Sequence, residues 1–261
     1  MDWYWTLLIV VSSVIVWVLL SMFLYKPFFK RFYDIVLSFF ALVLLSPLLI
    51  VVSIISRIKL GKGILFKQKR IGKNNKEFTL LKYRTMTNER DEKGVFLPDD
   101  QRRTKFGEFL RKSSIDELPS LINILKGDMS IIGPRPLPVR YLPRYTEEQK
   151  RRHEVRPGLS NPATTSGRNS QSWEDQFKRD VEYVDNLSLW TDIKSVFATI
   201  KVVLTREGAT AEDDGARGEF IGIADLSSLT TDEEGNFMKI CWRGFTSAHF
   251  YTIFGKSKHT V

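Results

Sequence analysis

The hydrophobic residues of this chain are concentrated in its first sixty positions, where they form two runs without charged side chains. Residues 3–25 form the first run, which would extend about 34 Å as a helix and could therefore cross a bilayer. Aromatic residues lie at both ends of the run, and the basic start and the cleavage site of a signal peptide are missing. The pattern predicts an N-terminal transmembrane helix over residues 1–27.

The second uncharged run, residues 35–56, is also long enough to span a bilayer, but Ser46 and Pro47 interrupt its centre. Because proline lacks an N–H and its ring clashes with the preceding turn, we expect a kink here, with the Ser46 hydroxyl bonding to a preceding carbonyl. A kinked spanning helix is one interpretation. Basic residues flank the run on both sides, however, and the positive-inside rule places both flanks in the cytoplasm. The charges therefore favour a re-entrant helix over residues 28–60.

After Gly61 the long hydrophobic runs end, and shorter strand and helix patterns typical of an α+β domain follow. Two segments of alternating polarity, 64–71 and 77–86, are joined by a short polar loop and predict a β-hairpin. Helical periodicity and start signals predict helices over residues 104–112, 146–154, 172–186 and 189–204. We therefore expect a mainly α fold with a small β-hairpin (α+β), with a cytoplasmic domain over residues 61–205. The C-terminal tail, residues 206–261, contains strand-like runs at 237–242 and 250–254 and has no functional interpretation.

Residues 111–137 contain an unusual arrangement of charged and hydrophobic positions. Ser113 and Ser114 each precede an acidic residue by three positions, which is the spacing of a capping box, and a helical hydrophobic face follows them. The stretch therefore predicts a helix whose first turn holds Asp116 and Glu117. The positive end of the helix dipole would keep both carboxylates ionised.

Composition and charge narrow the chemistry of this carboxylate pair. Two acids in a first turn are usually a helix cap, but this pair lies between Arg111 and Arg135, whose guanidinium groups suit anionic oxygens. The net charge of +9 suits nucleic acid, acidic lipid headgroups or nucleotide phosphates. The single cysteine excludes an internal disulfide, and the three scattered histidines lack the spacing of a zinc site. A bound metal is therefore expected to have oxygen ligands.

The run Ser114-Ile-Asp-Glu-Leu-Pro119, with the Asn-Ile-Leu-Lys-Gly-Asp-Met-Ser-Ile-Ile-Gly-Pro-Arg-Pro stretch at 123–136, resembles the bacterial sugar transferases that act as monotopic phosphoglycosyl transferases. The similarity covers residues 28–205 and keeps the family's order. Further matching positions are Lys30, Arg31, Asp34, Ser46-Pro47, Lys82, Arg84, Arg156-Pro157-Gly158 and Gly167-Arg168. The resemblance also implies the re-entrant geometry, with the Ser-Pro break turning the helix back within one leaflet.

The resemblance implies that residues 61–205 are a catalytic domain on the cytoplasmic face of the bacterial inner membrane. The implied reaction transfers a phosphosugar from a UDP-sugar to undecaprenyl phosphate and releases UMP, as the first membrane step in assembly of an O-antigen, capsule, exopolysaccharide or glycoprotein glycan. Asp116 would be the nucleophile of a ping-pong mechanism with a covalent aspartyl-phosphosugar, and Asp116 and Glu117 would bind Mg²⁺. The basic residues that it assigns to substrates are Lys82 and Arg111 for the lipid phosphate, and Arg135 and Arg168 for the nucleotide diphosphate.

Two other functions stay open beside this one. The chain could be a polyprenyl-phosphate glycosyltransferase that releases UDP, or a non-enzymatic membrane scaffold that binds nucleotides. A nucleic-acid partner is disfavoured, because the basic residues are dispersed and two segments suit lipid. The loop at Asn161-Pro162 departs from the family's pattern and changes the donors and rigidity there, so its effect on substrate choice is open. The sugar, the glycan pathway and the oligomeric state are open as well.

Overall fold

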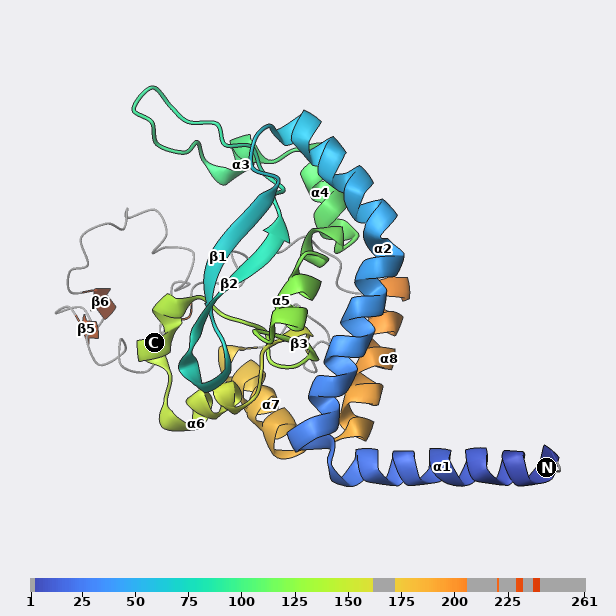
Figure 1. Ribbon diagram of the computed structural model, residues 1–261. Helices are drawn as coiled ribbons and strands as arrows, with labels where there is room; N and C mark the ends of the chain where they lie inside the picture. The colour runs from blue at the N-terminus through green and yellow to red at the C-terminus, as the bar shows by residue number, and fades with distance from the viewer. Residues whose placement is uncertain (1–2, 162–171, 206–219, 221–228, 232–236, 240–261) are drawn as a thin grey trace.

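The computed structural model describes residues 3–161, 172–205, 220, 229–231 and 237–239 (Figure 1). The expected mainly α fold with small β elements is confirmed. The helices are α1 (Trp3–Phe23), the π-helix η1 (Tyr25–Phe29), α2 (Lys30–Leu60), the 3-10 helix η2 (Lys73–Asn75), α3 (Asp99–Arg102), α4 (Lys105–Lys112), the 3-10 helix η3 (Ile115–Glu117), α5 (Ser120–Lys126), the 3-10 helix η4 (Val139–Arg144), α6 (Glu147–Lys150), the 3-10 helix η5 (Arg151–Glu154), α7 (Trp173–Asp185) and α8 (Leu189–Thr205). The strands are β1 (Leu65–Ile71), β2 (Glu77–Tyr83), β3 (Ser130–Ile132), β4 (Gly158–Ser160), β5 (Leu229–Thr231) and β6 (Phe237–Lys239).

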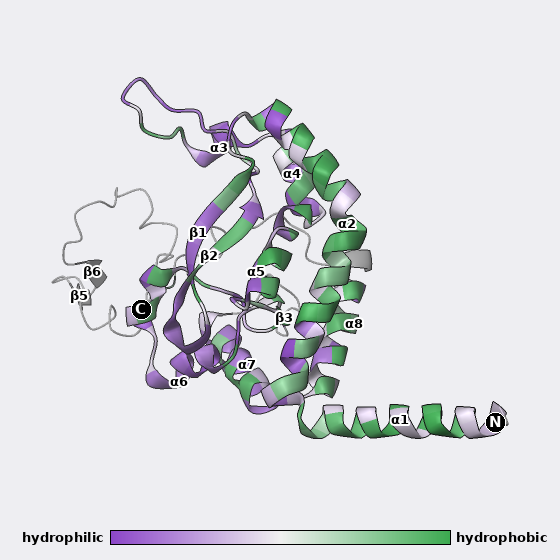
Figure 2. Cartoon of the chain, in the orientation of Figure 1, coloured by the Kyte–Doolittle hydropathy of each residue, from purple (hydrophilic) through white to green (hydrophobic). Residues whose placement is uncertain are grey.

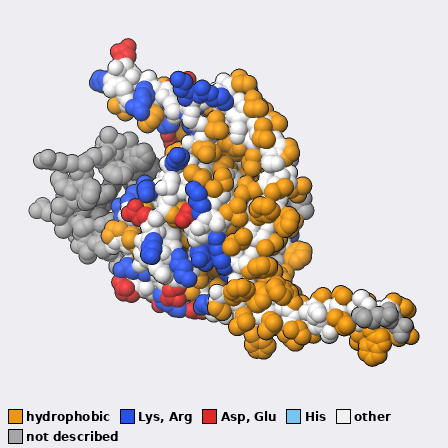
Figure 3. All heavy atoms as spheres, in the orientation of Figure 1, with side chains coloured by type: hydrophobic (Ala, Val, Ile, Leu, Met, Phe, Trp, Pro, Cys, Tyr) orange, Lys and Arg blue, Asp and Glu red, His pale blue; other side chains and the backbone are white. Residues whose placement is uncertain are grey.

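Two apolar segments at the N-terminus, Trp3–Phe23 and Tyr25–Leu60, are long and hydrophobic enough to cross a membrane. Helix α1 projects away from the rest of the molecule, whereas α2 lies along one side of the body formed by the later elements (Figure 2). Hydrophobic side chains gather along α1 and α2, whereas lysine and arginine side chains gather on the adjoining body (Figure 3). This separation is consistent with anchoring of the chain in a membrane through its N-terminal helices.

The Ser-Pro pair lies inside α2. The Ser46 hydroxyl donates a hydrogen bond of 2.7 Å to the carbonyl of Val43, as predicted, and this is the carbonyl that the missing N–H of Pro47 leaves without its helical donor. Helix α2 runs as one helix from Lys30 to Leu60 with Pro47 inside it, and the kink expected at the Ser-Pro pair stays a prediction. The serine hydroxyl thus replaces the lost hydrogen bond and lets the helix continue.

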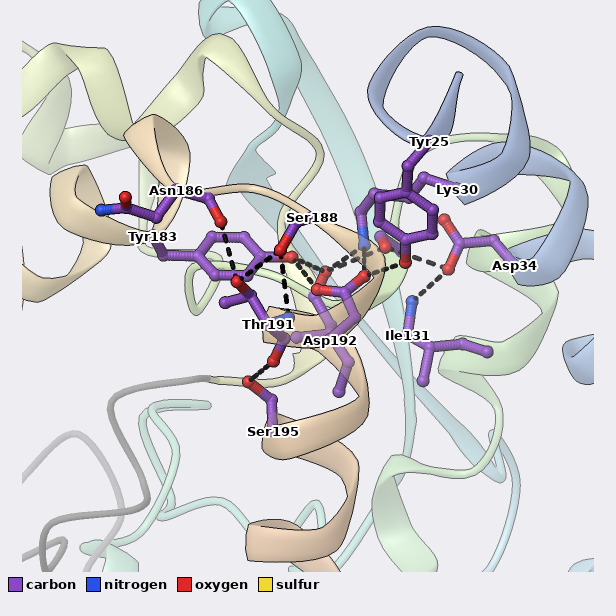
Figure 4. Close-up of polar contacts among 12 residues, drawn as sticks. Tyr25, Lys30, Asp34, Ile131, Tyr183, Asn186, Ser188, Thr191, Asp192 and Ser195 are labelled. Atoms are coloured by element: carbon purple, nitrogen blue, oxygen red, sulfur yellow. Dashed lines mark hydrogen bonds and ion pairs between the residues drawn. The ribbon is translucent and has the colours of Figure 1, made fainter. Parts of the chain in front are cut away.

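The first turns of α2 are attached to the body of the molecule by a buried cluster around Asp192 (Figure 4). One oxygen of the Asp192 carboxylate lies 2.6 Å from the Lys30 ammonium and accepts a hydrogen bond of 2.5 Å from the Tyr25 hydroxyl. Its other oxygen accepts a hydrogen bond of 2.6 Å from the Tyr183 hydroxyl. Four residues on from Lys30, the Asp34 carboxylate accepts from the backbone N–H of Ile131 at 2.9 Å. These contacts join the start of α2 to α7, α8 and β3.

The C-terminal end of α2 is held by the same body. The Arg84 guanidinium donates to the carbonyl of Leu60, the last residue of α2, and to that of Lys62 at 2.8 Å. A cation suits this position because the last carbonyls of a helix lack intrahelical donors and carry partial negative charge. Arg84 is buried, which suits this role in holding the end of the helix. Between the two ends, the Tyr83 hydroxyl donates to the Leu49 carbonyl at 2.9 Å.

The predicted hairpin is confirmed as the antiparallel pair of β1 and β2, with Phe66 opposite Lys82. Helix α5 packs against this hairpin, and their shared core also contacts the middle of α2. The second sheet, a parallel pairing of β3 with β4, was not expected from the sequence. In the tail β6 coincides with the first part of the expected run at 237–242 and pairs with β5, whereas residues 240–242 and 250–254 lie outside the described residues.

Candidate active site

Three predicted site residues meet where the end of β2 approaches η3. The Lys82 ammonium lies 2.8 Å from one carboxylate oxygen of Glu117, and the Arg135 guanidinium lies 3.7 Å from the same oxygen. These side chains are partly exposed, and they line a recess with Arg70, Ser120, Met129 and Gly158 among its other residues. Two cations on one carboxylate oxygen create a positive site next to Asp116. Such a site suits an anionic group such as a phosphate.

The local structure at Asp116 and Glu117 differs from the predicted helix start. The Ser113 hydroxyl donates to the Phe109 carbonyl at 2.7 Å, and Ser114 adopts a left-handed conformation without a side-chain cap. Both acids lie in η3, one turn before α5. The reason is Pro119, which in a longer helix could not donate to the Ile115 carbonyl; the N–H of Leu118 bonds to that carbonyl at 3.2 Å in its place.

The position of Lys82 depends on two buried polar side chains of α5 that sequence analysis did not single out. The Asn123 side chain accepts a hydrogen bond of 3.0 Å from the N–H of Leu81 and donates one of 2.8 Å to the carbonyl of Thr79. The Ser120 hydroxyl donates to the Leu81 carbonyl at 2.8 Å. These bonds fasten α5 to the edge of β2 immediately before Lys82. A polar residue within the hydrophobic stretch of 118–125 was the available sequence signal.

We expect Asn123→Ala to weaken both the fold and the activity. The substitution leaves the Leu81 N–H and the Thr79 carbonyl without these partners, which should lower the free energy of unfolding by about 2 to 4 kcal/mol. Lys82 would lose its register relative to Glu117, so the turnover of the folded fraction should fall as well. Thermal unfolding and initial rates measure the two effects. Asn186→Ala is the matched control, because the Asn186 side chain donates to the Glu182 carbonyl at an exposed position. An equal loss of stability and turnover in that variant would contradict the role of Asn123 in positioning Lys82.

The loop that carries Arg135 is positioned by a close approach of two glycines. Gly133 and Gly158 face each other where β3 and β4 pair, and the Gly158 N–H donates to the Pro134 carbonyl at 3.0 Å. A β-carbon on Gly158 would lie 2.1 Å from the backbone nitrogen of Gly133, so a side chain cannot be accommodated without moving a strand. The Gly-Pro-Arg-Pro and Arg-Pro-Gly motifs therefore lie side by side, with their backbones in close contact.

The backbone of Arg135 is also held by a buried ion pair, that of Arg152 with Asp180. Arg152 donates to its carbonyl at 2.9 Å and to one oxygen of the Asp180 carboxylate at 2.7 Å. Burial raises the pKa of Asp180 to about 6, while the charge of Arg152 acts in the opposite direction. Burial, together with Arg152, lowers the pKa of the neighbouring His153 to about 3, so this imidazole is neutral and serves the packing. Its Nδ1 lies 2.8 Å from the side-chain oxygen of Asn75 at the hairpin turn.

The other predicted cations are placed differently. Arg111, at the end of α4, donates a hydrogen bond of 2.9 Å to the hydroxyl of Thr85, which lies three residues after Lys82 in the chain. Arg111 is not among the residues that line the recess. Arg168 lies outside the described residues. Arg70 was not predicted; it is buried on β1, donates to the Pro136 carbonyl at 3.2 Å and lines the recess with Lys82. The alternating pattern of β1 gave no sign that this arginine faces inward.

A Mg²⁺ ion fits the residues present only as part of a larger shell. The part of the chain that the structure describes contains no group of three or more His, Cys, Asp or Glu side chains that could hold a metal. Mg²⁺ is commonly bound by one or two carboxylates, with water and substrate phosphates as further ligands. The adjacent carboxylates of Asp116 and Glu117 meet this smaller requirement. Any such ion would compete with Lys82 for Glu117.

Fold and site together define a membrane-associated protein with a recess lined by basic side chains beside a pair of carboxylates. Comparison with known families assigns it more closely. The chain belongs to the bacterial sugar transferase family, whose family model matches residues 25–206. The matched region contains α2, the hairpin, η3, α5 and the Arg135 loop.

Individual relatives agree with this assignment. The chain is 48% identical over 199 residues to an uncharacterized sugar transferase, EpsL, of Bacillus subtilis, covering 76% of this chain and 98% of that protein. It is 37% identical over 190 residues to a UDP-N-acetylgalactosamine-undecaprenyl-phosphate N-acetylgalactosaminephosphotransferase of Aeromonas hydrophila, covering 70% of this chain and 45% of that protein. It is 37% identical over 199 residues to an undecaprenyl-phosphate galactose phosphotransferase of Salmonella typhimurium, covering 70% and 42%. The chain thus spans less than half the length of these two phosphotransferases.

Proposed function

We propose that this sugar transferase moves a phosphosugar from a UDP-sugar to undecaprenyl phosphate and releases UMP, through a covalent intermediate on Asp116. The observation that carries the proposal is the contact of Lys82 and Arg135 with Glu117, directly beside Asp116. The names of the Aeromonas and Salmonella relatives, which refer to undecaprenyl phosphate and to phosphotransfer, support the substrate classes. The product would be the first lipid-linked sugar of a glycan.

In the first half-reaction a carboxylate oxygen of Asp116 attacks the phosphorus next to the sugar. The bond between this phosphorus and the oxygen that bridges to UMP breaks, and UMP leaves with that oxygen. Splitting the transfer into two displacements lets each partner bind in turn. Arg135, which is partly exposed at the recess, would hold the diphosphate, and Lys82 would reduce the repulsion between the attacking carboxylate and the phosphate.

In the second half-reaction a phosphate oxygen of undecaprenyl phosphate attacks the same phosphorus. The acyl phosphate bond breaks, the Asp116 carboxylate is regenerated, and the sugar is left on an undecaprenyl diphosphate. Lys82 and Arg111 would receive the lipid phosphate in this step. When bound, Mg²⁺ supplies charge neutralisation of the phosphates, and Asp116 and Glu117 are the side chains that would hold it.

Removal of divalent cations should abolish turnover. A carboxylate nucleophile and two phosphates bring several negative charges together, and Lys82 and Arg135 alone supply too little positive charge to offset them. We expect excess chelator to stop UMP release and added Mg²⁺ to restore it. Glu117→Gln should raise the Mg²⁺ concentration that gives half-maximal rate. Full activity in excess chelator would remove Mg²⁺ and the metal-binding role of Glu117 from the proposal.

We further propose that α2 is re-entrant and that the catalytic domain lies on the cytoplasmic face of the bacterial inner membrane. A spanning helix has its two ends on opposite sides of the bilayer, whereas both ends of α2 contact one polar body, through Lys30 and Asp192 at the start and through Arg84 at the end. Its middle packs on the same body while large apolar side chains elsewhere on the helix are exposed. A half-inserted helix would hold Asp116 at the depth of a lipid phosphate.

Cysteine labelling of sealed vesicles tests this topology. In a Cys241→Ser background, cysteines introduced at the exposed positions Lys26 and Lys62 should react from the same, cytoplasmic side, because both ends of α2 lie there. A cysteine at Trp3 should react from the opposite side, as expected if α1 crosses the bilayer. Reaction of the Lys26 and Lys62 positions from opposite sides would contradict a re-entrant α2 and make it a spanning helix.

The nucleotide that leaves distinguishes the proposed reaction from its rivals. Purified protein is incubated with UDP-sugars and undecaprenyl phosphate, and the soluble nucleotides are separated. Release of UMP is expected, whereas a glycosyltransferase would release UDP and a nucleotide-binding scaffold would release neither. UDP as the stoichiometric product would overturn phosphosugar transfer while leaving the family assignment unchanged.

A further inference from the structure

The tail of the chain inserts one aromatic residue into the catalytic domain. Phe220 is only 6% exposed, although the residues directly before and after it are not described. Its ring occupies an aromatic socket, which we define as Tyr141, Tyr145, Trp173 and Phe177; the ring centroids lie 5.7, 5.6, 5.7 and 4.9 Å from that of Phe220. Edge-to-face and stacked aromatic pairs at these separations are attractive beyond simple burial.

The backbone of Phe220 is bound as well. Its carbonyl accepts a hydrogen bond of 2.5 Å from the Arg144 guanidinium, and its N–H donates to the Tyr141 hydroxyl at 3.4 Å. Both partners belong to η4. Residue 220 lies beyond residues 25–206, the region that matches the family model. The socket is therefore built by the shared domain and filled by a residue from outside it.

The socket is connected to the candidate active site through Tyr145. The Tyr145 ring stacks on Phe220, and its hydroxyl accepts a hydrogen bond of 3.3 Å from Arg152. Arg152 in turn donates to the Arg135 carbonyl at 2.9 Å and to Asp180. Asp180 lies on α7, three residues after Phe177 of the socket. Phe220 thus packs against Tyr145, which accepts a hydrogen bond from Arg152, and against Phe177, which lies three residues before Asp180 on α7.

We propose that Phe220 is a positioning residue for nucleotide binding: by filling the aromatic socket it keeps Tyr145 and Arg152 in place, and so orients Arg135 toward the nucleotide diphosphate. This inference rests on the proposed function for the role of Arg135. A socket without Phe220 would be an apolar void beneath Arg152, and aromatic side chains that lose such a neighbour shift to fill the space. The tail then contributes to substrate affinity, and the catalytic unit extends to residue 220.

The test measures the dissociation constant of UDP, used as the probe, by calorimetry on full-length protein in nanodiscs. Phe220→Ala should weaken UDP binding by about threefold to tenfold in the folded protein, the size of coupling usually found between residues in contact. Tyr145→Phe keeps the ring and removes the hydroxyl that accepts from Arg152, and should weaken binding in the same direction. Because both changes act through Arg152, the double variant should bind UDP more tightly than the product of the two single effects predicts.

Two further variants separate positioning from general damage to the fold. Phe220→Leu keeps much of the apolar volume and should bind UDP with an intermediate affinity. Phe96→Ala removes the same ring from a surface position, where Phe96 is 46% exposed and contacts Arg90, and should leave the dissociation constant unchanged. If Phe220→Ala does not fold, Tyr145→Phe decides the matter, since it deletes a single hydroxyl.

The outcomes distinguish this inference from the proposed function. Wild-type affinity for UDP in folded Phe220→Ala and in Tyr145→Phe would overturn the positioning role and leave the proposed reaction standing. Exactly multiplicative effects in the double variant would overturn the route through Arg152. Failure of the wild-type protein to bind UDP at all would overturn the proposed nucleotide site, and the inference with it.

Discussion

Asp116→Asn should abolish turnover, lowering the rate of UMP release by at least about 1000-fold, because an amide is a far poorer nucleophile toward phosphorus than a carboxylate. Asp116 is half-buried in η3, beside the carboxylate that Lys82 and Arg135 contact. In the wild-type protein, a UDP-sugar without lipid acceptor should release at most one UMP per active site. The peptide that contains Asp116 should then gain the mass of one phosphosugar. The variant should show neither the burst nor the added mass.

A control and a contrary result define this prediction. Asp175→Asn makes the same chemical change at an exposed acid in the first turn of α7, where Asp175 contacts Ser172, and should leave the burst intact. If Asp116→Asn still releases UMP in its first turnover once undecaprenyl phosphate is added, the lipid phosphate attacks the UDP-sugar directly in a ternary complex. Asp116 would then be a metal ligand or a structural residue, and Glu117 would need a separate account.

Local patterns were sufficient to predict the elements whose stability is decided by neighbouring residues. The hairpin follows from alternating polarity on either side of a polar turn. The start of α4 follows from Thr104, whose hydroxyl caps the N–H of Gly107, and that of α7 from Ser172, which caps Asp175. Even the contact of Ser46 with the Val43 carbonyl could be anticipated, because proline removes a known hydrogen bond.

Contacts between distant segments could not be predicted in this way. Strands β3 and β4 have three residues each and are stabilised by pairing with one another, so neither carries a periodic signal of its own. The two serines before Asp116 met the spacing of a capping box, but the pattern does not include the effect of Pro119 four residues beyond Ile115. Asn123 lies on the same short helix as the hydrophobic residues, and its bonds to β2 depend on the hairpin's position.

The candidate site shows the same difference between what local patterns predict and what depends on contacts between distant segments. The resemblance named Lys82, Glu117 and Arg135, and the structure brings these three side chains together. Their supports, Arg152 and Asn123, are buried and contact backbone groups far away in sequence. Motif matching identifies groups that face a substrate. The side chains that hold those groups in place become apparent from the three-dimensional packing.

Asp192→Ala should strongly destabilise the attachment of α2 to α7, α8 and β3. The Asp192 side chain is 9% exposed and binds Lys30, Tyr25 and Tyr183. Its removal leaves the buried Lys30 ammonium without its anionic partner, although the ammonium still donates a hydrogen bond of 3.0 Å to the Ile132 carbonyl. Removing one partner of a buried ion pair typically costs about 3 to 5 kcal/mol, because the other charge stays buried without compensation. For a domain of this size we expect the unfolding temperature to fall by about 6 to 20 °C.

Thermal unfolding in nanodiscs measures the shift, and two variants show whether it comes from the buried charge. Asp99→Ala breaks the ion pair of Asp99 with Arg102, in which the aspartate side chain is 69% exposed, and should cost no more than about 1 kcal/mol. Adding Lys30→Met to Asp192→Ala removes the stranded ammonium and should recover part of the lost stability. If the double variant is less stable than Asp192→Ala alone, the loss comes from the tyrosine hydroxyls and packing around Asp192, and the ion pair with Lys30 contributes little to holding α2 on the domain.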